Sequence, residues 1–225
     1  MNRRAFIIAG TAALVPAATL AQNTSDEAKR LQDSITIFDE IMKAPDQSIP
    51  SSVLDKAEAI AIFPNTIKAG FVFGGMRGRG VLSAKNAGAW SEPTFMTLTG
   101  GSFGLQIGGQ AADLVLVIMQ RRGVESLLKN QFKLGADASV AAGPVGRDTQ
   151  ASTDLQLRAE ILSYSRARGL FAGVTVNGST VRVDGDANER FYGMRMQATD
   201  IVFGNKAPSR APVPDWIQTL ARYAK

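Results

Sequence analysis

The reactive side chains of this sequence favour binding over catalysis. Neither histidine nor cysteine occurs among its 225 residues. Histidine general bases, thiolate nucleophiles and most zinc sites need those side chains, so these mechanisms are excluded. Carboxylate pairs, a serine–lysine dyad and a metal held by carboxylates remain as catalytic options. We expect a protein that is not an enzyme and that has no cofactor.

One acidic run has the spacing that opens a calcium loop. Residues 184–188 read DGDAN and place oxygens at the first, third and fifth positions of such a loop. A calcium loop next needs a glycine and, at its twelfth position, a glutamate, whereas this chain has Glu189 and Arg195 there. The run therefore predicts a polar turn that leads into a helix, and no metal site.

Basic residues form two candidate sites for an anionic headgroup. Arginine matches phosphate with two parallel hydrogen bonds, and clustered basic side chains attract anionic lipid. In each case the alternative is a set of solvated charges that keep the protein soluble. The glycine-rich run 74–80 has no Gly-Lys pair, so it is not a phosphate-binding P-loop. The candidates are Arg77 and Arg79 in one group and Arg121, Arg122, Lys129 and Lys133 in the other.

The first residues resemble an export signal. Arg3 and Arg4 precede an apolar stretch, residues 5–15, that is too short to span a bilayer. Small residues then offer a cleavage site after Ala21. The paired arginines also fit a twin-arginine signal. We expect a periplasmic or secreted protein.

The net charge argues against a nucleic-acid partner. The formal charge is +5, and removal of Arg3 and Arg4 would lower it to +3. This mild excess allows anionic partners but is well below the charge of a typical nucleic-acid-binding surface. The roughly 200 residues of the mature chain suffice for one well-buried domain without disulfides.

The pattern of apolar residues predicts an α+β fold. Residues 24–43 form an amphipathic helix, with Thr24 and Glu27 as a capping box. Short strands interrupted by glycines follow, which indicates a curved antiparallel sheet or partly closed barrel flanked by short helices. Asn177-Gly178 predicts the turn of a hairpin over residues 174–181. A proline-rich linker then leads to a terminal helix with Asp215 as its N-cap.

Several runs, taken together and in order, resemble the SYLF family of lipid-binding domains. They read AIAIFP, KAGFVFGG, GRGVL, GGSFGLQIGGQAADLVLV, KLGADASVAAGPVGR, SYSRARGLFAGV and VRVDGDANERFYG, and they cover roughly residues 50–204. The resemblance implies binding of membrane lipid without enzyme activity. In eukaryotic members it implies phosphoinositide binding and, in some, actin binding, but we expect no actin partner in a periplasm.

The N-terminal helix departs from the basic helix by which eukaryotic members can engage membrane. It carries three basic residues against five acidic ones, so an anionic surface would repel it. We therefore predict that the glycine-rich part of the domain binds lipid. The expected organisation is a signal peptide (1–21), a SYLF-like domain (22–204) and a linker with a terminal helix (205–225). The alternative function is an envelope structural or stress protein that contacts proteins or peptidoglycan, and a carboxylate-dependent hydrolase is a third option.

Overall fold

The computed structural model describes residues 17–44, 48–69, 74–102, 110–129, 131–146, 158–167 and 169–224. The expected export signal at Arg3, Arg4 and residues 5–15 lies outside these ranges. Helix α1 already begins at Ala17, four residues before the expected cleavage site at Ala21. Export and cleavage therefore stay predictions.

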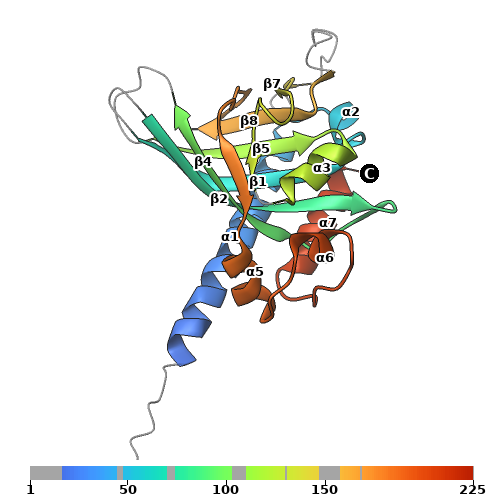
Figure 1. The fold of residues 1–225 in the computed structure, drawn as a ribbon. Coiled ribbons are helices and arrows are strands. Elements are labelled where there is room, and N and C mark those ends of the chain that lie inside the picture. The colour runs from blue at the N-terminus through green and yellow to red at the C-terminus, as the bar shows by residue number, and fades with distance from the viewer. Residues whose placement is uncertain are drawn as a thin grey trace, which may run out of the picture.

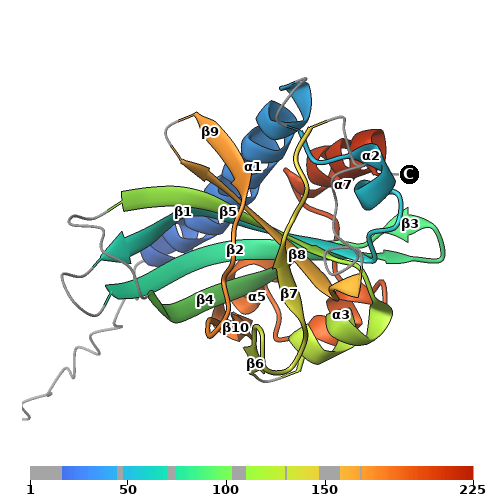
Figure 2. The same cartoon turned by 90° about the horizontal axis from the view of Figure 1, so that it is seen from above.

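Ten strands form one curved sheet, which Figures 1 and 2 show from two sides. Its order is β6-β10-β4-β2-β1-β5-β8-β7, with β3 paired to β2 and β9 paired to β8. The α+β fold is confirmed, and the sheet is antiparallel except where β7 pairs with β8. Within the described residues the end strands β6 and β7 do not pair, so the sheet is a half-barrel. The strands are β1 (Ala59–Ala69), β2 (Gly74–Asn86), β3 (Ala89–Trp90), β4 (Thr94–Ser102), β5 (Gln110–Ile118), β6 (Phe132–Lys133), β7 (Val140–Ala142), β8 (Ile161–Ala167), β9 (Leu170–Gly173) and β10 (Thr180–Val183).

Helices cover both faces of this sheet. Because side chains alternate along a strand, Ile60 and Ile62 of β1 belong to one apolar core and Ala61 and Phe63 to another. Helices α1, α5 and α7 contribute to the first core, and α3 contributes to the second. The helices described are α1 (Ala17–Lys43), α2 (Ser51–Leu54), α3 (Arg121–Leu127), α5 (Gly185–Tyr192), α6 (Ala198–Val202) and α7 (Val213–Tyr223).

Glycines permit close approach between β1 and β2, where the sheet curves. A Cβ atom added to Gly80 would lie 2.2 Å from the carbonyl oxygen of Ile62 and 2.6 Å from the ring of Phe63. A Cβ atom at Gly78 would lie 2.5 Å from the hydroxyl of Thr66. The pairing register between β1 and β2 also shifts between Ile62 and Ile67. Glycine is needed here because neighbouring strand atoms occupy the space of a side chain.

The amphipathic character of α1 is confirmed, but its predicted start is wrong. Leu31, Phe38 and Ile41 are buried in the core that α1 shares with the sheet. The helix extends back to Ala17, so Thr24 does not lie in its first turn. Glu27 is consequently not a capping residue, and its carboxylate makes tertiary contacts instead.

The predicted hairpin over residues 174–181 is wrong, although its turn exists. Gly178 has the positive φ of 81° that the turn requires, but residues 174–176 form no strand. The Gly178 N–H donates to the carbonyl of Leu134 at 2.8 Å, and β10 pairs with β4 and β6. Distant segments thus satisfy the backbone groups that a local hairpin would have paired.

The terminal helix α7 packs into the first core. Trp216 is completely buried, and its indole N–H donates to Ser83 Oγ at 2.8 Å. The indole N–H of Trp90 in turn donates to the carbonyl of Ala224 at 3.0 Å. The helix begins at Val213, so Asp215 lies in its first turn and the predicted N-cap is wrong. Residues 213–224 are therefore part of the same packed unit as the sheet.

Candidate functional site

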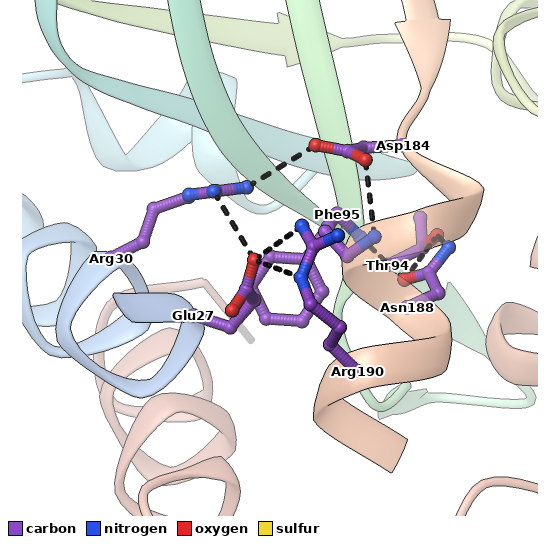
Figure 3. Close-up of polar contacts among 8 residues, drawn as sticks. Glu27, Arg30, Thr94, Phe95, Asp184, Asn188 and Arg190 are labelled. Atoms are coloured by element: carbon purple, nitrogen blue, oxygen red, sulfur yellow. Dashed lines mark hydrogen bonds and ion pairs between the residues drawn. The ribbon is translucent and has the colours of Figure 1, made fainter. Parts of the chain in front are cut away.

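A cluster of four charged residues joins α1 to α5, as Figure 3 shows. Glu27 Oε1 accepts a hydrogen bond from Arg190 Nη2 at 2.8 Å and lies 3.6 Å from Arg30 Nη2. Arg30 Nη1 lies 3.7 Å from Asp184 Oδ2, and its guanidinium lies over the ring of Phe95. Glu27 is 2% exposed and Arg30 is 8% exposed, so the two residues from α1 are buried, whereas Asp184 and Arg190 are partly exposed.

Burial dominates the electrostatics of the cluster. It lowers the pKa of Arg30, and the carboxylates of Glu27 and Asp184 only partly oppose this effect. Glu27 Oε2 and Arg30 Nη1 make no hydrogen bond to any described residue. Every charge in the cluster nevertheless has an oppositely charged neighbour, so the arrangement ties elements together rather than presenting a reactive group.

Helix α5 is fixed by two further contacts. Asp184 is its N-cap and accepts a hydrogen bond from the Ala187 N–H at 3.1 Å, which confirms the predicted polar turn into a helix. Asn188 Oδ1 accepts from the Phe95 N–H at 2.9 Å, and Asn188 Nδ2 donates to Thr94 Oγ1 at 3.0 Å (Figure 3). Among the described residues, no group of three or more acidic side chains is placed to hold a metal ion.

Two of the four residues in the second predicted basic group, Arg121 and Arg122, make contacts within the fold. Arg121 donates to the carbonyl of Lys85 at 2.8 Å, and its guanidinium lies 3.8 Å from the ring centre of Phe203. Arg122 forms an ion pair with Glu160. Both arginines lie in the first turn of α3. These contacts indicate that Arg121 has a structural role.

Lys133 does not lie with Arg121 and Arg122 but on the same part of the sheet as Arg77 and Arg79. It pairs with Thr180 across β6 and β10, Thr180 pairs with Thr99 of β4, and Thr99 pairs with Arg77 of β2. Directly paired residues point to the same face of a sheet. Lys133 and Arg77 therefore share one face, and the alternation along β2 adds Arg79 to it.

The same register brings in an arginine that the sequence reasoning missed. Arg182 pairs with Thr97, which pairs with Arg79. Alternation along β10 places Arg182 on the face of Thr180, a signal that becomes useful once the partners of β10 are known. We call Arg77, Arg79, Arg182 and Lys133 the basic sheet face; all four residues are exposed.

The charges of the basic sheet face have few partners. The side chains of Arg77, Arg79 and Lys133 form no hydrogen bond or ion pair within the described structure. Arg182 donates to the neutral side chain of Gln131 at 3.0 Å. With strands about 4.8 Å apart, Arg182 lies roughly 10 Å from Arg79, and Lys133 lies roughly 14 Å from Arg77. Threonines separate these side chains, so the face is basic and polar.

A pocket of about 230 Å³ lies where the basic sheet face meets α1. Arg79 lines it from β2, Pro64 and Asn65 line it from β1, and Arg30 and Lys29 line it from α1. Asp26 and Asp33 also line it, and Asp33 pairs with Lys29 at 2.8 Å. The pocket is therefore of mixed charge, and the more strongly basic surface is the open sheet beside it. No helix among the described residues is long and apolar enough to cross a bilayer.

The described residues form a half-barrel whose sheet exposes a basic face. Comparison with known proteins gives the family. A model of the Ysc84 family, described as a Las17-binding protein actin regulator, matches residues 99–224. The chain belongs to this family, the SYLF family indicated by the motifs.

Named relatives extend the match over most of the chain. The human SH3 domain-containing YSC84-like protein 1 is 34% identical over 210 residues, which are 92% of this chain and 61% of that protein. The rat protein of the same name is 33% identical over the same shares. LAS seventeen-binding protein 3 of Saccharomyces cerevisiae is 36% identical over 173 residues, which are 75% of this chain and 38% of that protein. The chain thus spans less than two thirds of these relatives.

Proposed function

We propose that this protein binds anionic membrane lipid through the basic sheet face and has no catalytic activity. The observation that carries the proposal is the register that gathers Arg77, Arg79, Arg182 and Lys133 on one exposed face. Charges that the fold does not use are available to lipid phosphates. The absence of histidine and cysteine and the structural use of the buried charge cluster support a binding role.

The magnitude of the electrostatic attraction is sufficient for binding. Each basic residue near an anionic surface contributes about 1 kcal/mol. Four such residues would contribute about 4 kcal/mol, which corresponds to roughly a thousandfold in affinity at low salt. Helix α1 cannot supply this attraction, because its charged residues are net acidic and Glu27 and Arg30 are buried against each other.

Vesicle co-sedimentation of a charge-reversal variant tests the proposal. The double variant Arg77→Glu and Arg79→Glu should bind vesicles rich in phosphatidylglycerol at least tenfold more weakly than the parent at low salt. The matched control is Lys56→Glu with Arg195→Glu, which changes the net charge equally at exposed positions outside the basic sheet face. Circular dichroism must show that both variants are folded.

Two outcomes would overturn the proposal. One is a parent protein that does not sediment with anionic vesicles more than with vesicles of phosphatidylcholine alone. The other is an equal loss of binding in the control variant, because the net charge would then explain the effect without this face.

The proposed location is the periplasm or the exterior of the cell. It is supported by Arg3-Arg4, the apolar residues 5–15 and the small residues that end at Ala21. Cell fractionation and sequencing of the mature N-terminus would test it. Full-length protein in the cytoplasm would contradict it.

Binding of a protein partner is a second candidate, favoured by the name of the yeast relatives. The same basic sheet face could attract an acidic protein, as in the alternative of an envelope protein with protein contacts. Two results together would favour this candidate. The parent protein would not bind anionic vesicles, and a protein partner would bind the parent but not the Arg77→Glu and Arg79→Glu variant.

A further inference from the structure

Large apolar side chains are exposed at three positions of the described structure. Leu170 is 69% exposed, Ile67 is 56% exposed and Met194 is 52% exposed. Burial of such side chains is favourable, so two of them exposed at the same end of the fold suggest a surface that contacts an apolar phase.

The strand register places Ile67 at one end of the sheet, beside the basic sheet face. Ile67 of β1 pairs with Arg77 of β2 and with Ala111 of β5. Its row continues through Thr99 and Thr180 to Lys133. An exposed isoleucine thus lies on the same face as two basic residues and directly beside one of them.

Leu170 lies at the same end of the sheet but on the opposite face from Ile67, because it pairs with Ala167, the neighbour of Arg166 on β8. It is the first residue of β9, directly after the turn at Gly169 that follows β8. The pairing of Arg166 with Asp113 places the last part of β8 beside the first part of β5. Gly169 and Ala111 line a common pocket of about 280 Å³. Figure 2 shows the end of β1 and the start of β9 at the same end of the sheet.

Two acidic side chains at this end share one arginine, which offsets one of their two charges. Arg166 Nη2 lies 2.9 Å from Asp113 Oδ2, and Arg166 also pairs with Glu40 of α1. The carboxylates that would otherwise repel an anionic surface therefore have a shared counter-charge. Met194 differs, because it follows α5 and is not part of this sheet end.

We infer that this sheet end docks on an anionic bilayer with Ile67 and Leu170 inserted among the acyl chains and Arg77 and Lys133 at the phosphates. The inference rests on the proposed lipid binding and adds the orientation and the anchoring residues. An aliphatic anchor next to basic residues uses the two attractions that a bilayer surface offers. Because Arg77 lies directly beside Ile67, one orientation on the bilayer brings Ile67 to the acyl chains and Arg77 to the phosphates.

Site-specific fluorescence tests this orientation. Because the chain has no cysteine, a single introduced cysteine accepts an environment-sensitive dye at one position only. Labelled Ile67→Cys and Leu170→Cys should show a blue shift and a rise in intensity with phosphatidylglycerol vesicles. Labelled Met194→Cys, the matched control, should not respond. Ala111→Cys keeps both anchors in place and reports on the same sheet end if an anchor substitution weakens binding.

The outcomes separate this inference from the proposed function. If labelled proteins co-sediment with vesicles but the dyes at 67, 170 and 111 do not respond, lipid binding stands and this orientation is wrong. A response at 194 equal to that at 67 would also overturn it. If no labelled protein and no parent binds anionic vesicles, the proposed function itself fails. As a second measurement, Ile67→Ser with Leu170→Ser should weaken binding at least tenfold, and Met194→Ser should leave it unchanged.

Discussion

Arg190 Nη2 donates a hydrogen bond to Glu27 Oε1 at 2.8 Å and so joins α5 to α1 across 163 residues of sequence. Glu27 also balances the charge of Arg30, which is itself buried. The pair with Arg190 therefore holds α1 to α5, and Arg166 of β8 pairs with Glu40 further along α1 and holds the helix to the sheet.

Substitution of Glu27 should be strongly destabilising. Glu27→Ala leaves the buried Arg30 with Asp184 at 3.7 Å as its counter-charge, and breaking a buried ion pair costs about 3 kcal/mol or more. Urea denaturation measures the change in the free energy of unfolding. Asp33→Ala removes the exposed pair with Lys29 and should cost less than about 1 kcal/mol. Equal losses in the two variants would show that the buried cluster has no special weight.

Trp216 should be essential for the stability of the whole domain. Trp216→Ala empties a completely buried site and should cost about 3–5 kcal/mol. Ser83→Ala removes the acceptor of the buried indole N–H and should cost about 1–3 kcal/mol. Chemical denaturation followed by far-UV circular dichroism checks both values. A Trp216→Ala variant as stable as the parent would mean that α7 is an appendage.

Gly80 should not tolerate a side chain, whereas Gly75 on the same strand should. The added methyl group of Gly80→Ala would collide with backbone and ring atoms of β1, and such overpacking costs about 1–3 kcal/mol. No atom lies within 4 Å of a Cβ atom at Gly75. Thermal unfolding of the two variants provides the comparison. A larger loss for Gly75→Ala would contradict the close approach of β1 and β2.

Two buried tyrosines should make stability fall at alkaline pH. Burial raises the pKa of Tyr164 and of Tyr192 well above the usual value of 10. The two hydroxyls therefore stay protonated in the folded protein at pH values where they ionise in the unfolded chain. Their contribution to the free energy of unfolding is complete below pH 10 and is lost as the pH rises above it. The loss can reach about 1.4 kcal/mol per pH unit for each tyrosine.

Denaturation at pH 9 and pH 11 measures this slope, and tyrosine-to-phenylalanine variants should reduce it. At neutral pH the two variants should differ. Tyr192→Phe removes a hydrogen bond to the carbonyl of Pro93 and should cost about 1 kcal/mol. The Tyr164 hydroxyl has no hydrogen-bond partner in the described part of the chain, so its removal should be neutral or stabilising. If neither variant changed the slope of stability against pH, the two tyrosines would not be its cause.

Arg182 should contribute to lipid binding although the sequence did not indicate it. Arg182→Gln should weaken binding to anionic vesicles about fivefold at low salt, because it removes about 1 kcal/mol of attraction. The effect should shrink at high salt, where exposed charges are screened. Arg122→Gln is the matched control, since Arg122 already pairs with Glu160. A larger loss of vesicle affinity in the Arg122→Gln variant would show that the lipid site lies on α3 instead.

The sequence by itself determined the elements and the family. The apolar spacing in α1 and the glycines of the strands are local patterns, and local patterns set helix faces and sheet curvature. The ordered motifs gave the SYLF resemblance, which the family match over residues 99–224 confirms. Local patterns also misled, because Thr24 and Glu27 read as a helix cap and Asn177-Gly178 as a hairpin.

The tertiary structure decided which charges meet. Glu27 and Arg190 form a pair because α1 and α5 pack side by side, and spacing along the sequence carries no signal of that contact. Lys133 and Arg182 join Arg77 because β10 inserts between β6 and β4. Strand partners are chosen by long-range burial and backbone hydrogen bonding, which depend on the whole core rather than on any one segment. The candidate site is therefore a property of the sheet register.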